Sequence, residues 1–72
     1  MPKLPRLGSR KILAILFKFG FYEHHTTGSH INLRHLTKLH LHVVVPSKRL
    51  IIAPKTLKSI LVQAELNIED LF

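Results

Sequence analysis

The spacing of apolar residues changes twice along this chain, and this change limits the possible fold more than any other feature. Apolar side chains follow helical spacing from Ile12 to Phe19, alternate with polar ones over much of residues 21–45, and return to helical spacing from Leu57 to Ala64. A period near 3.6 indicates an amphipathic helix, and a period of two indicates a strand with one buried face. The sequence therefore predicts an α+β fold with strands between two helices.

Residues that favour turns and helix ends divide these segments into elements. Ser9 is predicted to cap the first helix, and Gly20 is predicted to end it. Three strands should follow, at residues 21–26, 30–36 and 40–45. The connections between them are short, which favours an antiparallel meander. A helix, three antiparallel strands and a helix, with both helices on one face of the sheet, is the layout of a double-stranded-RNA-binding domain.

The remaining segments are less regular. Pro54 suits the first turn of the second helix, and Asn67 is predicted to cap a short terminal turn. The connection at residues 47–53 contains an apolar triplet, which either docks on the core or extends briefly as a strand. Residues 1–8 should form an extended lead-in with two basic side chains free to touch phosphate, Lys3 and Arg6.

Chain length and the lack of cysteine restrict how the fold is stabilised. Seventy-two residues make a single domain, residues 1–72, whose core is thin because folding at this size buries only about three fifths of the chain's surface. Without cysteine there is no disulfide and no thiolate metal site. The longest apolar run contains Lys18 and is too short to cross a bilayer, and no signal-peptide cleavage pattern follows it. We therefore expect a cytoplasmic protein.

The charge of the chain is strongly positive and unevenly distributed. Residues 1–64 hold all eleven Lys and Arg and a single acid, Glu23, and so carry a formal charge of +10. A solvated charged surface is the simplest explanation, but a surplus of this size also attracts polyanions. We favour nucleic acid as the partner, with an anionic membrane or an acidic protein as alternatives.

The alternation in the strands separates two faces of the predicted sheet. In the second strand apolar residues alternate with His30, Asn32 and Arg34, and in the third they alternate with His40 and His42. One face should therefore be core and the other rich in histidine and arginine. In a double-stranded-RNA-binding domain, RNA contacts come from the first helix, the first hairpin turn and the start of the last helix. The basic side chains predicted at the two helical places are Lys11, Lys18, Lys55 and Lys58.

The remaining histidines raise the question of a metal site. Residues two apart on a strand share a face, so pairs of imidazoles can approach one another. However, no cysteine or well-spaced acid completes a ligand set with the histidines concerned, which are His24, His25, His35, His40 and His42. We predict no metal site and no cofactor.

The first helix has a wider apolar band than one core contact requires. Leu13 and Phe17 extend the band beyond the stripe that should face the sheet. Both side chains are either additional core or a hydrophobic surface that meets another protein.

Several short motifs, in this order and spacing, resemble the HicA family of toxins, small messenger-RNA endonucleases of toxin-antitoxin pairs. The motifs are Pro5-Arg6-Leu7, Gly20-Phe21, Gly28-Ser29-His30, Val45-Pro46, and Thr56-Leu57 through Gln63-Ala64. The resemblance implies a fold like the double-stranded-RNA-binding domain, RNA cleavage that depends on His30, and neutralisation by a HicB-like antitoxin. Gly28 and Ser29 would then form the turn that supports the histidine.

The chain departs from the family pattern at three places. Many members carry a histidine shortly after the valine-proline pair, where this chain has Ser47-Lys48, and a glycine before the threonine-leucine pair, where it has Lys55. The role of a second histidine is therefore in doubt here. Phe17 replaces a residue that is often charged, which again indicates a hydrophobic partner for the first helix.

The chemistry of His30 fits the role that the resemblance implies. Imidazole exchanges protons near neutral pH, so it can take the proton of a ribose 2′-hydroxyl or supply one to the leaving oxygen. Gly28 can adopt positive φ and admit a phosphate, and Arg34 lies on the same strand face as His30. We predict a toxin-type RNA endonuclease. The alternatives are a non-catalytic RNA-binding module of the same fold and a protein-binding subunit that uses the first helix.

Overall fold

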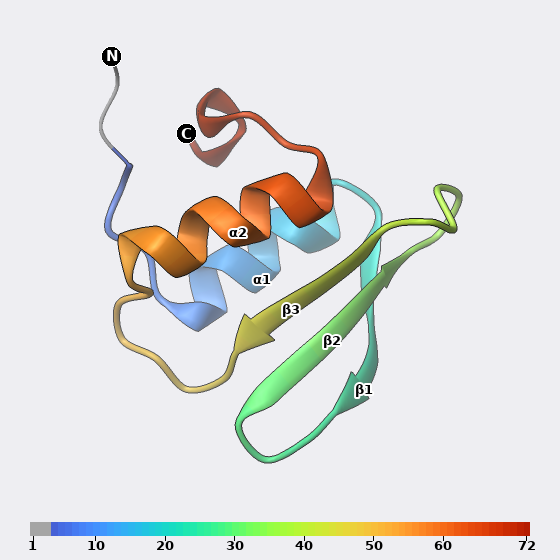
Figure 1. The fold of residues 1–72 in the computed structure, drawn as a ribbon, viewed down its shortest axis with the longest axis horizontal. Coiled ribbons are helices and arrows are strands. Elements are labelled where there is room, and N and C mark those ends of the chain that lie inside the picture. Colours follow the sequence, from blue (N-terminus) through green and yellow to red (C-terminus); the bar gives the residue numbers. More distant parts are fainter. Residues whose placement is uncertain (1–3) are drawn as a thin grey trace.

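The computed structural model describes residues 4–72, which form two layers, a sheet and a pair of helices on one of its faces (Figure 1). The elements in chain order are α1 (Ser9–Lys18), β1 (Phe21–Thr26), β2 (His30–His35), β3 (His42–Pro46), α2 (Pro54–Ala64) and the 3-10 turn η1 (Ile68–Leu71). The strands are antiparallel in the order β1-β2-β3. The predicted α+β layout, like that of a double-stranded-RNA-binding domain, is confirmed.

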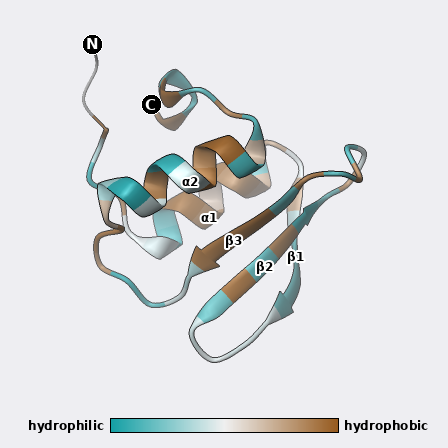
Figure 2. Ribbon diagram, viewed as in Figure 1, coloured by the Kyte–Doolittle hydropathy of each residue, from teal (hydrophilic) through white to brown (hydrophobic). Residues whose placement is uncertain are grey.

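The core lies between the sheet and the helices. Leu33, Val43 and Val45 point from β2 and β3 toward the helices and are fully buried. They meet Leu16 of α1 and Leu57 of α2 in a single cluster, and hydrophobic residues recur along both helices and along β3 (Figure 2). Burying one such side chain contributes about 1.5–3 kcal/mol, so the alternation in the strands holds both helices on the same face.

Two strands are shorter than predicted. β2 ends at His35 and β3 begins at His42, and the residues between them form a turn. Leu36 is 68% exposed, so an extension of β2 to this residue would not bury its side chain. Leu41 is buried outside the strand and anchors the turn, while the side chain of His40 meets the carboxylate of Glu65 at 3.2 Å.

The prediction that Ser9 caps α1 is wrong. Gly8 is the N-cap and Ser9 is the first helical residue, with a side chain only 4% exposed. Its hydroxyl donates to the backbone oxygen of Pro46 at 2.6 Å and accepts from the backbone N–H of Arg49 at 2.9 Å. The hydroxyl thus satisfies two backbone groups of another segment, and these long-range contacts replace the local capping bond.

The lead-in and the 47–53 connection are held against each other. The backbone N–H of Ile52 donates to the oxygen of Leu7 at 2.7 Å, and Leu7 packs on the core. Ile52 is buried, whereas Leu50 is 94% exposed, so the connection is a loop docked by one residue of its apolar triplet. Lys3 lies outside the described residues, and Arg6 is exposed. Within residues 4–72, no helix has the length and apolar character needed to span a membrane.

Gly20 joins α1 to β1 in a conformation that disfavours other residues. Its φ is +95°, and a Cβ built there would lie 2.8 Å from Nε2 of His35. That nitrogen bonds to the oxygen of Phe19 at 2.8 Å, while Nδ1 accepts from the backbone N–H groups of Thr37 and Lys38. Because Nδ1 accepts, we assign the proton to Nε2. His35 therefore ties the end of α1 to the turn after β2, and Gly20 leaves room for its ring.

We expect Gly20→Ala to lower the free energy of unfolding by about 1–3 kcal/mol, because it combines positive φ with a clash against a bonded ring. Urea denaturation measures the change. Gly28→Ala is the matched control, since a Cβ at Gly28 meets nothing within 4 Å and its φ is not positive. The control should change stability by less than about 0.5 kcal/mol. Equal losses in the two variants would contradict this account.

Candidate active site

The hairpin turn between β1 and β2 presents His30 at the end of the sheet. The turn does not use a positive φ at Gly28, although a glycine permits one. The turn is instead held by the end of β3, because the hydroxyl of Ser47 donates to the oxygen of Gly28 and its backbone N–H donates to the oxygen of Ser29, both at 3.0 Å. His30 itself pairs with Pro46 across the sheet. Ser47 therefore supports the turn.

The imidazole of His30 is exposed and oriented by its neighbour. Its Nδ1 lies 2.9 Å from Oγ of Ser29. The direction of this bond depends on the tautomer. When Nδ1 carries the proton and donates to the hydroxyl, Nε2 keeps a free lone pair and can accept a proton from a substrate. The contact thus gives Ser29 a physical means of preparing the ring as a base.

His30 lines a cleft of about 470 Å³ between the β3 edge, the 47–53 loop and α2. Its polar side chains come from Arg49 on the loop and from Thr56, Ser59 and Gln63 on α2. Thr56 and Ser59 are three residues apart, so they lie on one side of the helix. An arginine beside an imidazole gives the cleft both a cation for phosphate and a group for proton transfer.

Gln63 fixes one wall of this cleft. Its Oε1 accepts the backbone N–H of Val44 at 3.0 Å, which is the outward-facing donor of the β3 edge. The glutamine therefore holds α2 beside β3. The motif that ends in Gln63-Ala64 thus combines one contact to the sheet edge with one buried core residue.

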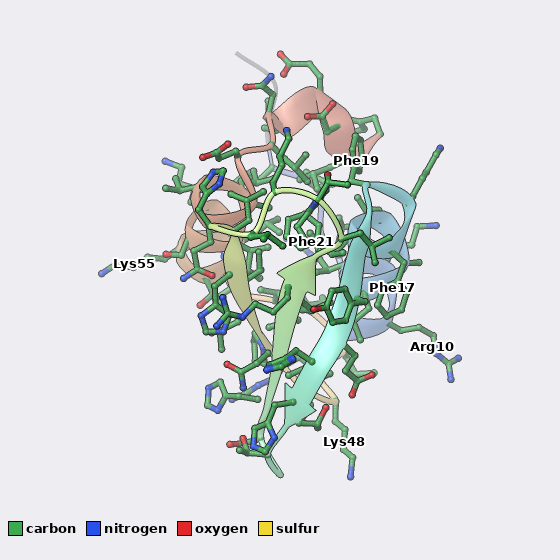
Figure 3. All side chains as sticks on the ribbon, turned by 90° about the vertical axis from the view of Figure 1, so that its right-hand side faces the viewer. Arg10, Phe17, Phe19, Phe21, Lys48 and Lys55 are labelled. Atoms are coloured by element: carbon green, nitrogen blue, oxygen red, sulfur yellow. The ribbon has the colours of Figure 1, made fainter. Side chains whose placement is uncertain are left out.

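The cleft at His30 is not lined by the basic residues that the sequence predicted on α1, β2 and α2. Lys55 and Lys58 are exposed on α2 and do not line the cleft, and Lys55 projects away from the sheet (Figure 3). Lys11 instead lines a hollow beside the acidic terminal turn, with Glu69 and Asp70. Arg34 shares the sheet face of His30 but lies four residues along β2, which is about 13 Å.

Arg49 is a charged cleft residue to which the sequence assigned no role. It stands in a loop without periodicity, so its position depends on the contacts of its backbone rather than on any pattern. The N–H of Arg49 donates to Ser9 Oγ, and its oxygen accepts from the N–H of Ser9 at 3.0 Å. The basic pair Lys48-Arg49, which follows Ser47, was the available signal, but only the fold shows that Arg49 lines the cleft at the start of β2.

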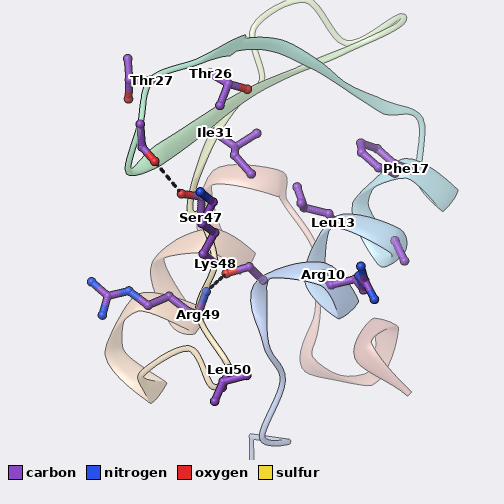
Figure 4. A pocket seen from close by; sticks show the side chains of 13 residues that line it. Arg10, Leu13, Phe17, Thr26, Thr27, Ile31, Ser47, Lys48, Arg49 and Leu50 are labelled. Atoms are coloured by element: carbon purple, nitrogen blue, oxygen red, sulfur yellow. Dashed lines mark hydrogen bonds between the residues drawn. The ribbon is translucent and has the colours of Figure 1, made fainter.

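The apolar residues predicted to meet a protein partner line a groove other than the cleft at His30. This groove, of about 880 Å³, lies between α1 and the end of the β1–β2 hairpin (Figure 4). Phe17 is 48% exposed and Leu13 is partly buried against the core. Arg10 and Lys48 also line the groove. Leu13 therefore serves the core and the groove together, whereas Phe17 contributes mainly to the groove.

The histidines do not form a metal-ligand set in the part of the chain that is described. Within residues 4–72 no group of three or more His, Asp or Glu side chains converges. Instead, His35 bonds backbone groups, His40 meets Glu65, and Nε2 of His42 lies 3.1 Å from Oδ1 of Asn32. Each of these three rings thus has a partner within the protein.

The structure is a basic α+β domain with the layout of a double-stranded-RNA-binding domain and an exposed histidine after its first hairpin turn. Residues 9–66 match the family model described as the HicA toxin of bacterial toxin-antitoxin, a span from the start of α1 to just beyond α2. The chain therefore belongs to the HicA family of toxins, and the predicted resemblance is confirmed. No curated protein matches it.

The contact between Ser9 and the loop that carries Arg49 gives a test of how this site is supported. We expect Ser9→Ala to lower the free energy of unfolding by about 1–3 kcal/mol, because it leaves the backbone N–H of Arg49 and the oxygen of Pro46 without their partner. Thermal or urea unfolding measures this. Ser59→Ala is the control, since that exposed hydroxyl bonds only within its own helix, to Lys55. A Ser9→Ala change as small as the control's would show that the bridge is dispensable.

Proposed function

We propose that this toxin is an endoribonuclease that cleaves messenger RNA with His30 as its proton-transfer residue, and that cleavage blocks translation in the cytoplasm. The observation that carries the proposal is the Ser29–His30 contact at 2.9 Å beside a cleft that also holds Arg49. Membership of the HicA toxin family and the formal net charge of +7 support it. A polyanion is drawn to such a surface, and an oriented imidazole can then act on it.

In the proposed reaction the ribose 2′-hydroxyl is the nucleophile. Nε2 of His30 takes its proton while the 2′-oxygen forms a bond to the adjacent phosphorus, and the bond from phosphorus to the 5′-oxygen breaks. The leaving 5′-oxygen takes a proton from the solvent or from the protonated ring. Assistance by one such group typically contributes about 10²- to 10⁴-fold, so a single histidine gives a modest catalyst. Ser29 acts through the histidine and is a positioning residue.

The cations have separate roles in this proposal. Arg49 is the side chain that lines the cleft with His30, so it is the candidate for direct contact with the reacting phosphate. Lys55 and Lys58 lie on the same helix as the cleft residues and bind phosphates beyond it. Lys11 lines a different hollow and Arg34 lies about 13 Å from His30 along β2, so they hold the RNA without touching the reacting group.

A specific observation supports a second candidate function. The histidine that many family members carry shortly after the valine-proline pair is absent here, and Ser47 bonds to Gly28 instead. A chain with a serine after this pair, and with His30 at the hairpin, can also serve as a non-catalytic RNA-binding module. The two functions differ in whether RNA is cut.

His30→Ala should reduce cleavage of a long single-stranded RNA by about 10²- to 10⁴-fold and leave RNA binding within about threefold, because the ring supplies proton transfer rather than charge. Gel analysis measures the cleavage rate and anisotropy measures the affinity, after circular dichroism has shown that both proteins are folded. The matched control is His40→Ala, which removes an exposed histidine paired with Glu65. Cleavage at the native rate by His30→Ala would remove the proposed mechanism, and binding without cleavage by the native chain would favour the RNA-binding module.

We also propose a HicB-like antitoxin protein as partner, bound through the groove that Leu13 and Phe17 line. The support is an aromatic side chain 48% exposed in an apolar groove, with Arg10 and Lys48 among its lining residues. An exposed apolar patch with basic neighbours suits a partner that offers apolar side chains and acids.

Phe17→Ala should weaken binding of a HicB-like antitoxin by about 10- to 100-fold, since buried aromatic residues dominate many interfaces. Titration calorimetry measures the affinity, and growth during co-expression measures neutralisation. Phe72→Ala is the control, because Phe72 is 80% exposed and lies outside the groove. Equal affinity of both variants for the antitoxin would place the interface elsewhere.

A further inference from the structure

The sheet face opposite the helices carries a row of side chains that the cleft does not use. Directly paired residues of antiparallel strands project on the same face. Tyr22 of β1 pairs with Arg34 of β2, and Arg34 pairs with His42 of β3. Since the neighbours Leu33 and Val43 point into the core, this row points away from the helices. An aromatic ring, a guanidinium and an imidazole thus lie side by side across the sheet.

Local contacts extend and fix the row. The register of β1 shifts between Glu23 and His25, and the ring of the intervening His24 lies edge-on to Tyr22, with centroids 6.4 Å apart and planes at 81°. On the other side, the bond from His42 Nε2 to Asn32 Oδ1 holds the imidazole over β2. The row is therefore a surface of four planar cationic or aromatic groups.

Acidic side chains are kept off this surface. Glu23 pairs with the buried Leu33, so it projects toward the helix side, where its carboxylate accepts from the hydroxyl of Thr26. The other three acids of the chain lie within residues 65–70. The ion pair found within residues 4–72 joins His40 to Glu65, so no acid neutralises Arg34 there. The row thus keeps its positive charge available.

We propose that this open sheet face is a platform for single-stranded RNA, on which unpaired bases stack against Tyr22 and Arg34 while the strand runs on toward His30. The proposal rests on the proposed endonuclease function and names its substrate class. Aromatic rings and guanidinium planes bind the faces of unstacked bases, which a duplex hides within its own stack. Arg34 lies about 13 Å from His30 along β2, so it meets a nucleotide neighbouring the one that is cut.

The chain carries its own probe for this test. Tyr22 is the only tyrosine, and the chain has no tryptophan, so intrinsic fluorescence reports on this position. The native protein is titrated with a short 2′-O-methyl oligouridine, which lacks the nucleophile for cleavage, and corrected for absorption by the RNA. We expect saturable quenching of tyrosine emission, with the same dissociation constant that anisotropy of labelled RNA gives.

Substitutions then separate stacking from charge. Tyr22→Leu and Arg34→Ala should each weaken oligouridine binding by about 5- to 100-fold, as loss of a stacking partner does. Lys18→Ala removes one exposed charge on α1, and should weaken binding by only about two- to threefold. Circular dichroism confirms that each variant is folded, and Arg34→Lys shows whether the planar guanidinium matters beyond its charge.

Three outcomes would overturn the platform. In the first, RNA binds without quenching the tyrosine emission, and Lys18→Ala and Arg34→Ala weaken binding equally. That result would mean that RNA binds elsewhere by charge alone. Tighter binding of a duplex, unaffected by Tyr22→Leu, would assign recognition to the helices and the hairpin. Loss of antitoxin binding but not of RNA binding in Tyr22→Leu would make the face a protein interface. In each case cleavage by the native chain, and its loss in His30→Ala, is measured separately, so the endonuclease proposal stands or fails independently.

Discussion

The buried hydroxyl of Ser9 connects the helix layer to the sheet and loop that form the candidate site. It joins the first residue of α1 to the end of β3 and to the loop that carries Arg49. The same loop begins with Ser47, which holds the hairpin turn before His30. A bonded path therefore runs from α1 through the loop to the turn. In a domain of this size, where the core is thin, a few satisfied polar contacts at such a junction carry a large share of its stability.

This arrangement assigns different surfaces of a very small toxin to different parts of the fold. The helices and one sheet face form the core, the β3 edge and α2 form the cleft at His30, and α1 with the hairpin end forms the apolar groove. Arg49 lines both the cleft at His30 and the apolar groove. A protein bound in the groove would therefore approach the cation that we place at the reacting phosphate, which offers a physical route from antitoxin binding to loss of activity.

Much of the fold follows from residue patterns, whereas much of the site does not. Alternation correctly separated Leu33 from Arg34, and helical spacing correctly placed Leu57 and the rest of α2. The position of Arg49 and the role of Ser9 escaped the sequence, because both depend on contacts between residues about forty positions apart. Local preference assigned Ser9 a capping bond, but two backbone groups of a distant loop compete for the same hydroxyl. The face of a strand can be predicted from the chain alone, but the approach of a loop to that face cannot.

The edges of the sheet influence how readily copies of the molecule aggregate. Gln63 covers a free N–H on the outer side of β3, and the register shift at His24 interrupts the outer side of β1. A regular row of unpaired backbone groups would act as a template for another strand, and both devices break that row. Strand-by-strand aggregation is thus hindered at both edges of the sheet by one amide and one extra residue.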